Sequence, residues 1–263
     1  MRAGLLPFTS MLLVAQAQPP TRAERAVQLH PAVATPDPAV FARAAEARRA
    51  MEAASPLAAI PFRCVGPMGQ GGRVVALAAD ERRPEVWLAA FATGGLWITR
   101  TDGSTWEPLF DREEAFALGD VAVRWAEPGV PGTIWVGTGE PNASRSSYAG
   151  TGVFRSDDGG RTWKHLGLRG SHRIARIVLH PKDPDTVYVA AQGPLYSDGG
   201  ERGVFRTTDG GRSWTCVLPG GRRTGAADLL MDWKDPSTLY AALWEKDRRP
   251  WDFLESGAGS GLH

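Results

Sequence analysis

From Phe62 onward, short apolar runs alternate with turns rich in Gly, Pro and Asp, and the pattern repeats at a regular interval. A triplet of Gly followed by two apolar residues begins at Gly95, Gly152 and Gly203, and a turn and a Trp follow each triplet. An apolar run with one aromatic residue in a fixed place precedes each triplet and occurs a fourth time; these aromatic residues are Trp87, Trp135, Tyr188 and Tyr240. A repeat of about fifty residues that carries four short strands is typical of a propeller blade.

The repeat predicts an all-β fold: a β-propeller segment over residues 62–263 with about three and a half four-stranded blades, truncated within the fourth blade. In the first two blades we expect strands at residues 73–79, 85–91, 95–100 and 105–110, and at 120–125, 133–138, 152–156 and 162–166. In the next two we expect them at 174–180, 186–191, 203–207 and 213–218, and at 226–232 and 238–245, with a further strand opening at Gly261.

The residues ahead of the repeat predict export and one helix. A positive residue, an apolar run and an Ala-Gln-Ala sequence form the pattern of a signal peptide over residues 1–17. Residues 18–37 are polar and contain Pro, so we expect a linker there. Asp37 followed by Pro predicts the cap of a helix over residues 38–56. The protein is therefore expected to be secreted, periplasmic or part of the cell envelope.

The composition narrows the classes of function. The chain of 263 residues has a formal net charge of +1, which gives no electrostatic reason to expect a nucleic-acid partner. Its 31 Gly and 20 Pro residues indicate many turns. No apolar run is long enough to predict a membrane span. Because the His and Cys spacings of metal sites and the motifs of cofactor sites are missing, we expect no metal and no cofactor.

One polar turn occurs twice, with the pattern Ser/Thr-x-Asp-x-Gly-x-Thr/Ser-Trp. In such a turn the carboxylate can accept backbone N–H groups, the Gly supplies a positive φ and the Trp covers the hairpin. We expect a structural role, because neither copy has the number of ligands that a calcium loop needs. The residues of the two copies are Ser156, Asp158, Gly160 and Trp163, and Thr207, Asp209, Gly211 and Trp214.

Together with their flanking segments, these turns resemble the bacterial BNR/Asp-box proteins related to the extracellular domain of sortilin. The segments that carry the resemblance are 137–142, 152–163, 177–185, 201–211 and 224–228. It implies a multi-bladed propeller in an exported protein, of a kind often labelled a glycosyl hydrolase. The first blade is also similar to that of the xyloglucan-cleaving propeller glycosidases, in which an Asp stands where this chain has Ala92. That departure argues against carrying the activity over.

Long loops are predicted at one end of the propeller, between the second and third strands of a blade, at residues 139–151, 192–202 and 246–260. Loops on a rigid scaffold are where binding residues gather. Their polar and aromatic side chains suit a carbohydrate or a peptide or protein ligand. The predicted binding residues on these loops and the adjoining strands are Glu140, Asn142, Arg145, His172, Arg176, Arg248 and Trp251.

Two functions fit these loops. The first hypothesis is an exported, non-catalytic binding or scaffold propeller. The alternative is a glycoside hydrolase acting on a polysaccharide, which needs two carboxyl groups about 5–9.5 Å apart. The candidate catalytic residues are Glu140, Asp120 and Asp228.

Charged residues also interrupt the first strand of three blades, at equivalent positions: Asp120, Arg176 and Asp228. First strands of neighbouring blades run side by side around the propeller axis. We therefore predict that Arg176 lies between the two carboxylates, because a partly buried charge needs compensation.

Overall fold

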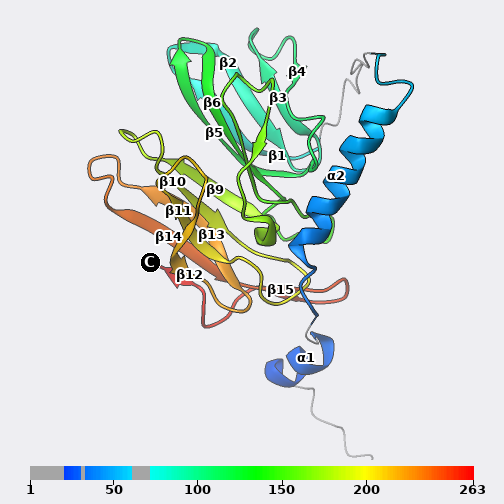
Figure 1. The fold of residues 1–263 in the computed structure, drawn as a ribbon. Helices are drawn as coiled ribbons and strands as arrows, with labels where there is room; N and C mark the ends of the chain where they lie inside the picture. Colours follow the sequence, from blue (N-terminus) through cyan, green and yellow to red (C-terminus); the bar gives the residue numbers. More distant parts are fainter. Residues whose placement is uncertain (1–20, 31–32, 61–71) are drawn as a thin grey trace, which may run out of the picture. The chain divides into compact units, whose positions relative to one another are not determined.

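The computed structural model describes three ranges, and all structural statements below concern them: residues 21–30, 33–60 and 72–263. The signal peptide predicted at residues 1–17 lies outside the described residues. The chain divides into two units, Met1–Pro31 and Ala32–His263. The first unit contains helix α1 (Arg22–Leu29), and the second contains helix α2 (Pro38–Ala54) and the strands (Figure 1).

Helix α1 begins at a reciprocal cap. The Glu24 carboxylate accepts the backbone N–H of Thr21 at 2.8 Å, and the Thr21 hydroxyl accepts the backbone N–H of Glu24 at 3.3 Å. This capping box satisfies N–H groups that a helix start otherwise leaves without partners. The linker predicted at residues 18–37 thus contains a short helix that the sequence analysis did not predict.

Helix α2 begins as its sequence predicts. The Asp37 side chain accepts the backbone N–H of Ala39 at 2.9 Å, and Pro38 occupies the first helical position. The helix ends where Ser55 turns to extended backbone ahead of Pro56. The predicted helix before the propeller is therefore confirmed.

Most strands of the second unit form four antiparallel sheets, one for each predicted blade, and β15 (Asp247–Arg248) and β16 (Phe253–Leu254) form a separate two-stranded hairpin. The first sheet has the order β1 (Val74–Asp80), β2 (Arg83–Phe91), β3 (Gly95–Thr99) and β4 (Glu107–Pro108). The second has β5 (Leu118–Glu127), β6 (Val130–Thr138), β7 (Val153–Ser156) and β8 (Lys164–His165). The third has β9 (Ile174–Leu179), β10 (Val187–Ala191), β11 (Gly203–Thr207) and β12 (Thr215–Pro219). The fourth has β13 (Thr224–Met231), β14 (Leu239–Glu245) and β17 (Gly261–Leu262).

The first strand of each sheet lies innermost, against the first strand of the next sheet. Strand β1 contacts β5, β5 contacts β9, and β9 contacts β13. This radial arrangement of antiparallel sheets, three of them four-stranded and the last three-stranded, is that of a β-propeller. The predicted fold class is confirmed.

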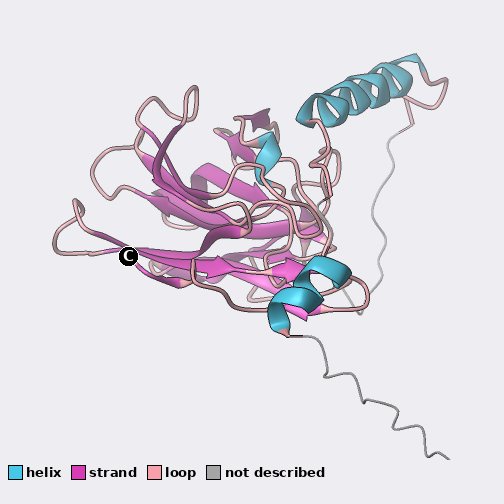
Figure 2. Ribbon diagram, turned by 90° about the horizontal axis from the view of Figure 1, so that it is seen from below, coloured by secondary structure: helices cyan, strands magenta, loops and turns pink. Residues whose placement is uncertain are grey.

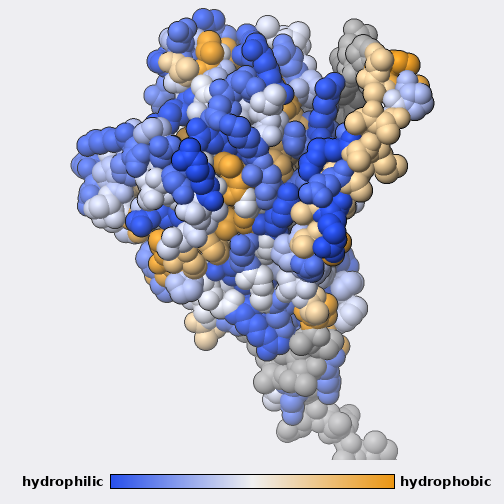
Figure 3. Space-filling view, viewed as in Figure 1, coloured by the Kyte–Doolittle hydropathy of each residue, from blue (hydrophilic) through white to orange (hydrophobic). Residues whose placement is uncertain are grey.

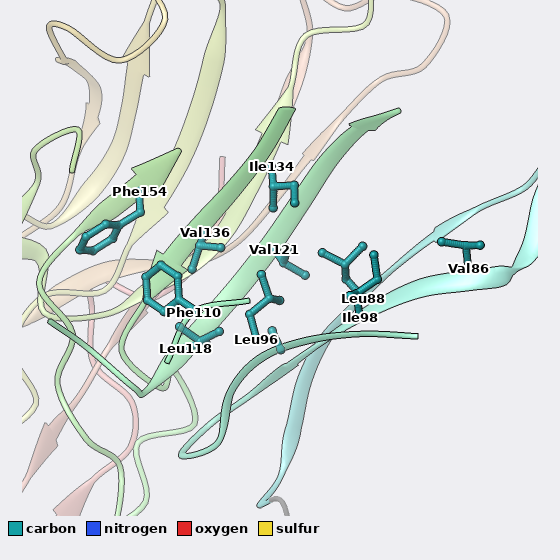
Figure 4. Packing of buried hydrophobic residues seen from close by; sticks show 11 residues of the cluster. Val86, Leu88, Leu96, Ile98, Phe110, Leu118, Val121, Ile134, Val136 and Phe154 are labelled. Atoms are coloured by element: carbon teal, nitrogen blue, oxygen red, sulfur yellow. The ribbon is translucent and has the colours of Figure 1, made fainter. Parts of the chain in front are cut away.

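Figure 2 shows the sheets as stacked layers of strands. Apolar side chains pack between successive sheets. Between the first and second sheets, Leu88 of β2 and Leu96 of β3 pack with Val136 of β6 (Figure 4). Separate clusters fill the next two spaces, around Trp135 and Ile174 and around Val204 and Ala226. The alternation of apolar positions along each strand produces these layers, because successive side chains point to opposite faces of a sheet.

The two repeated polar turns close the β7–β8 and β11–β12 hairpins. In the first, Asp158 Oδ1 accepts the backbone N–H groups of Arg161 and Thr162 at 3.0 and 2.9 Å. Gly160 has a φ of +91°. The Trp163 indole donates to the Leu109 carbonyl at 2.8 Å, which ties this turn to the preceding sheet. In the second turn the Trp214 indole donates to the Leu166 carbonyl at 2.5 Å in the same way.

The structure departs from the strand predictions mainly at the ends of blades. The outer strands β4 and β8 have two residues each, shorter than predicted. The loop at residues 246–260 contains a small hairpin of β15 (Asp247–Arg248) and β16 (Phe253–Leu254) that the pattern did not predict. A further turn, the 3-10 helix η1 (Arg169–Ser171), connects the second and third sheets.

Candidate functional site

The site lies at the end of the propeller where the loops 139–152, 192–202 and 246–260 emerge. The connections between successive sheets, including η1, reach the same end because each innermost strand begins there. Figure 1 shows β15 of the last loop at this end, and the turns of the two repeated Asp motifs close the opposite ends of their hairpins. We call this end the loop face.

Three charged residues from neighbouring inner strands meet near the loop face. Arg176 of β9 donates from Nε to Asp228 Oδ1 of β13 at 2.8 Å, and its Nη1 lies 3.8 Å from Asp120 Oδ1 of β5. Asp120 also accepts the backbone N–H of Ile177 at 2.6 Å. The prediction that Arg176 lies between the two carboxylates is confirmed.

The two carboxyl groups have different environments. The Asp120 side chain is buried, and that of Asp228 is 59 % exposed. Burial raises the pKa of Asp120 to about 6, although the Ile177 N–H and Arg176 act against it. For Asp228, partial burial is outweighed by hydrogen bonds from Arg176 and the Leu229 N–H, which lower its pKa. One guanidinium therefore holds a carboxyl group that binds a proton near neutral pH beside one that remains ionised.

Glu140 is not part of this group. Its side chain is fully buried and accepts from Nε and Nη2 of Arg73, at 2.7 Å for each oxygen. Asn142 donates to the same carboxylate at 3.2 Å. These hydrogen bonds outweigh the effect of burial and lower the pKa of Glu140. No described contact joins Glu140 to Asp120 or Asp228. Of the three catalytic candidates, Asp120 and Asp228 therefore share Arg176, whereas Glu140 is paired separately with Arg73.

Several predicted binding residues occupy exposed positions on the loop face. Asn142 and Arg145 are exposed, and the Arg145 carbonyl accepts the Tyr196 hydroxyl at 2.9 Å. Arg248 lies over the Phe253 ring at 4.7 Å, and the Trp251 side chain is exposed. His172 does not share this exposure.

His172 follows η1 and is buried, with a φ of +54°. Its ring packs edge-on against Phe41 of α2, with 5.9 Å between centroids. Burial, with the nearby Arg173 and Arg202, lowers its pKa to about 4. His172 is therefore a neutral imidazole beneath α2 at neutral pH.

A buried basic cluster on the loop face was missed by the sequence analysis. Its members are Arg173, Arg202 and Lys246, each less than 10 % exposed. All three contact Gln192: its N–H donates to the Arg173 carbonyl at 2.9 Å, its carbonyl accepts from Arg202 at 2.5 Å, and its Oε1 accepts from Lys246. Lys and Arg side chains are expected at the surface, so nothing in the sequence pattern marks these three as buried.

The acidic residues near the cluster form ion pairs with other arginines. Asp198 accepts from Arg222 and Arg223, the latter at 2.5 Å. Asp247 accepts from Arg223 at 2.6 Å and lies 3.3 Å from Arg249. These ion pairs join the loop 192–202 to the loop 246–260.

Two kinds of feature were not found in the described part of the chain: a group of metal ligands and a helix able to span a membrane. Within it, no three His, Cys, Asp or Glu residues are grouped as metal ligands. None of its helices has both the length and the apolar character that crossing a membrane requires.

Two curated proteins that are similar to this chain are both named as xyloglucanases. A probable oligoxyloglucan-reducing end-specific xyloglucanase of Neosartorya fischeri is 26% identical over 179 residues, which cover 62% of this chain and 19% of that protein. An oligoxyloglucan-reducing end-specific xyloglucanase of Emericella nidulans is 30% identical over 132 residues, covering 49% and 15%. No protein-family model matches the sequence. The chain thus spans a fifth or less of the length of these relatives.

Among solved structures, an ancestral GH74 enzyme is similar with a TM-score of 0.52 and 19% identity, over 70% of this chain and 24% of that enzyme. At this level of identity the likeness shows the β-propeller fold alone. The two curated relatives nevertheless correct the first functional hypothesis. Both are glycosidases by name, so the prediction of a non-catalytic binding propeller is wrong, and the alternative of a glycoside hydrolase is favoured.

Proposed function

We propose that the chain is part of an exported glycoside hydrolase that acts on a polysaccharide at the loop face of its propeller. The observation that carries this proposal is the pair Asp120 and Asp228, which contact the same guanidinium and have pKa values shifted in opposite directions. The similarity to two xyloglucanases supports it from an independent direction. It makes a carbohydrate the ligand class, and the comparisons give no support to a peptide or protein ligand.

In this proposal Asp120 is the general acid and Asp228 the nucleophile or general base. Asp120 gives its proton to the glycosidic oxygen as the bond to the anomeric carbon breaks. Asp228 either attacks that carbon or takes a proton from the attacking water, and one water is consumed per bond. Glycosidase carboxyl groups lie about 5–9.5 Å apart, a spacing that carboxylates on two sides of one guanidinium can meet. Arg176 holds the pair and acts as a positioning residue.

Ala92 explains why these carboxylates differ from those of the xyloglucan-cleaving propellers. It is fully buried, and its N–H donates to the Arg73 carbonyl at 2.8 Å. A methyl group there can neither donate nor accept a proton, so an acid and a base must come from other positions. Asp120 and Asp228 adjoin the loop face, and their pKa values are shifted in the opposite directions that an acid and a base need.

We also propose a family and a location for the protein. We infer a BNR/Asp-box propeller, related to sortilin and the bacterial BNR proteins, from the two repeated turns and their contacts. Export to the cell envelope or medium rests on the signal-peptide pattern at residues 1–17. Hydrophilic residues dominate the propeller surface in view in Figure 3, as suits a protein that acts on a hydrated polysaccharide.

The test is hydrolysis of a panel of polysaccharides, xyloglucan included, measured as new reducing ends. We expect Asp120→Asn and Asp228→Asn each to lower kcat by about 100-fold or more, because general acid–base catalysis contributes that much. The wild-type rate should fall as the pH rises through about 6, where Asp120 loses its proton.

The matched control is Glu127→Gln, at the other end of β5 from Asp120, which should keep the wild-type rate. Release of no sugar from any substrate, or full activity in both aspartate variants, would refute the proposal.

A further inference from the structure

The buried basic cluster lacks a compensating negative charge. No ion pair in the described part of the chain joins Arg173, Arg202 or Lys246 to a carboxylate. The nearest acids are already engaged: Asp198 and Asp247 by the arginines described above and Glu140 by Arg73. Buried charges are ordinarily paired, since their removal from water is costly.

Backbone carbonyls hold the cluster in place but do not neutralise it. Arg202 donates to the carbonyls of four residues of its own loop: Gln192, Pro194, Ser197 and Gly199. Arg173 donates to the carbonyl of Ser147 at 3.2 Å. The Lys246 ammonium lies over the Trp244 ring at 4.1 Å and donates to Gln192. Carbonyl dipoles and a ring face offset part of a positive charge, and a net charge remains.

Donors are also left over. In the described residues, the buried Arg173 Nε finds no hydrogen-bond partner. In its protonated form Lys246 has three donor protons, and Gln192 takes one of them. An unsatisfied buried donor costs about 1–3 kcal/mol, so natural proteins rarely keep one without a ligand or a function.

We propose that Arg173, Arg202 and Lys246 form a binding site for the carboxylate of an acidic sugar unit, a uronic acid, in the polysaccharide. Arg173 and Lys246 supply the donors, and Arg202 supplies charge while it fixes the loop. This inference rests on the proposed action on a polysaccharide and narrows it to acidic glycans.

Aromatic side chains around the cluster favour a sugar over a free anion. Tyr148 follows Ser147, which contacts Arg173, and pairs with Phe116 at 5.3 Å between ring centroids. Both rings are about half exposed. Trp251 is exposed in the loop that begins at Lys246. Exposed rings beside a charged group suit the apolar face of a sugar next to its carboxylate.

The probes are oligogalacturonide, a neutral xyloglucan oligosaccharide and inorganic sulfate, each measured by calorimetry and by the shift in Tm of the full chain. We expect the oligogalacturonide to bind and to raise Tm. Lys246→Met should weaken that binding about tenfold or more, as expected for loss of a charge-assisted hydrogen bond. The matched control Lys234→Met removes an exposed lysine that lies over Trp233 and should bind as the wild type does.

A second readout separates a ligand site from a structural lysine. Burial, with Arg173 and Arg202, lowers the pKa of Lys246 to about 6, and a bound carboxylate favours the protonated form. Binding at pH 7 should therefore take up a proton, seen as an enthalpy that depends on the buffer, and Lys246→Met should abolish the uptake. Without ligand, Lys246→Met should melt at or above the wild-type temperature.

The outcomes separate this inference from the proposed function. If oligogalacturonide does not bind, or binds Lys246→Met equally well, the inference is wrong even if the protein hydrolyses neutral glycans. If sulfate binds as tightly as oligogalacturonide, the site is one for a simple anion and the sugar assignment is wrong. Uronide binding without any hydrolysis would support the inference and refute the proposed function.

Discussion

At the scale of single residues, Asp120 couples the site to the stability of the fold. Its pKa in the folded protein, about 6, lies above the ordinary value of 3.8 because of burial. As the pH falls from 6 to 4, the folded protein takes up a proton before the unfolded chain does. The contribution of Asp120 to stability therefore rises as the pH falls and is lost as the pH rises through about 6.

We therefore expect the free-energy difference between the wild type and Asp120→Asn to depend on pH. Between pH 4 and pH 7, the free energy of unfolding of the variant should rise by on the order of 2 kcal/mol relative to that of the wild type, measured by urea unfolding. The comparison with the variant is needed because Glu140 and Asp228 have lowered pKa values and act in the opposite sense. A difference that is constant with pH would show that Asp120 is ionised throughout.

At the scale of elements, the polar turn between β7 and β8 illustrates a structural use of an acidic motif. Gly160 has a φ of +91°, and a Cβ there would lie 3.1 Å from a Leu109 methyl group. Gly160→Val should lower the free energy of unfolding by about 2–3 kcal/mol, because it adds backbone strain and crowding. Because this turn is at the opposite end from the loop face, hydrolysis per folded molecule should not change.

Arg161→Ala is the matched control, since its side chain is exposed and only its backbone N–H joins the turn. Its stability should remain within about 0.5 kcal/mol of the wild type. A loss of activity in folded Gly160→Val would instead give the turn a part in the chemistry.

The elements also show what a sequence pattern can and cannot predict. Period-two apolar runs and the repeat predicted the inner strands well, and equivalence between blades placed Arg176 beside two aspartates. The hairpin β15–β16 was missed because four strand residues in two short runs give no alternation to detect. Helix α1 was missed although Thr21 and Glu24 have the spacing of a capping box, a sequence signal of a helix start that the prediction did not use.

At the scale of the whole molecule, the basic cluster was missed in the sequence analysis and the hydrolase function proposed above was not favoured there, both for the same reason. Arg173 and Arg202 border strands of the third sheet and Lys246 follows β14 of the fourth, so the packing of these two sheets and their loops buries the three together. The proposed catalytic carboxyl groups, Asp120 of β5 and Asp228 of β13, also come from different blades, so they form no local motif. Absence of a motif was therefore weak evidence for a binding protein.

Close approach of neighbouring blades should control the stability of the whole propeller, and Gly119 tests this. It lies on β5, and a Cβ there would come within 1.9 Å of the Ile174 carbonyl oxygen on β9. That oxygen belongs to the backbone and cannot move aside without separating the two inner strands. Gly119→Ala should therefore lower the free energy of unfolding by about 1–3 kcal/mol, the usual cost of overpacking, in urea melts.

Gly261→Ala is the matched control, because a Cβ at Gly261 would meet its nearest atom, His263 Nε2, at an ordinary 3.6 Å. It should unfold as the wild type does. The strand separation caused by Gly119→Ala should also move Asp120, the next residue, away from Arg176 and lower the hydrolysis rate along with the stability. Gly119→Ala with unchanged stability would mean that the second and third blades do not approach as closely as this packing requires.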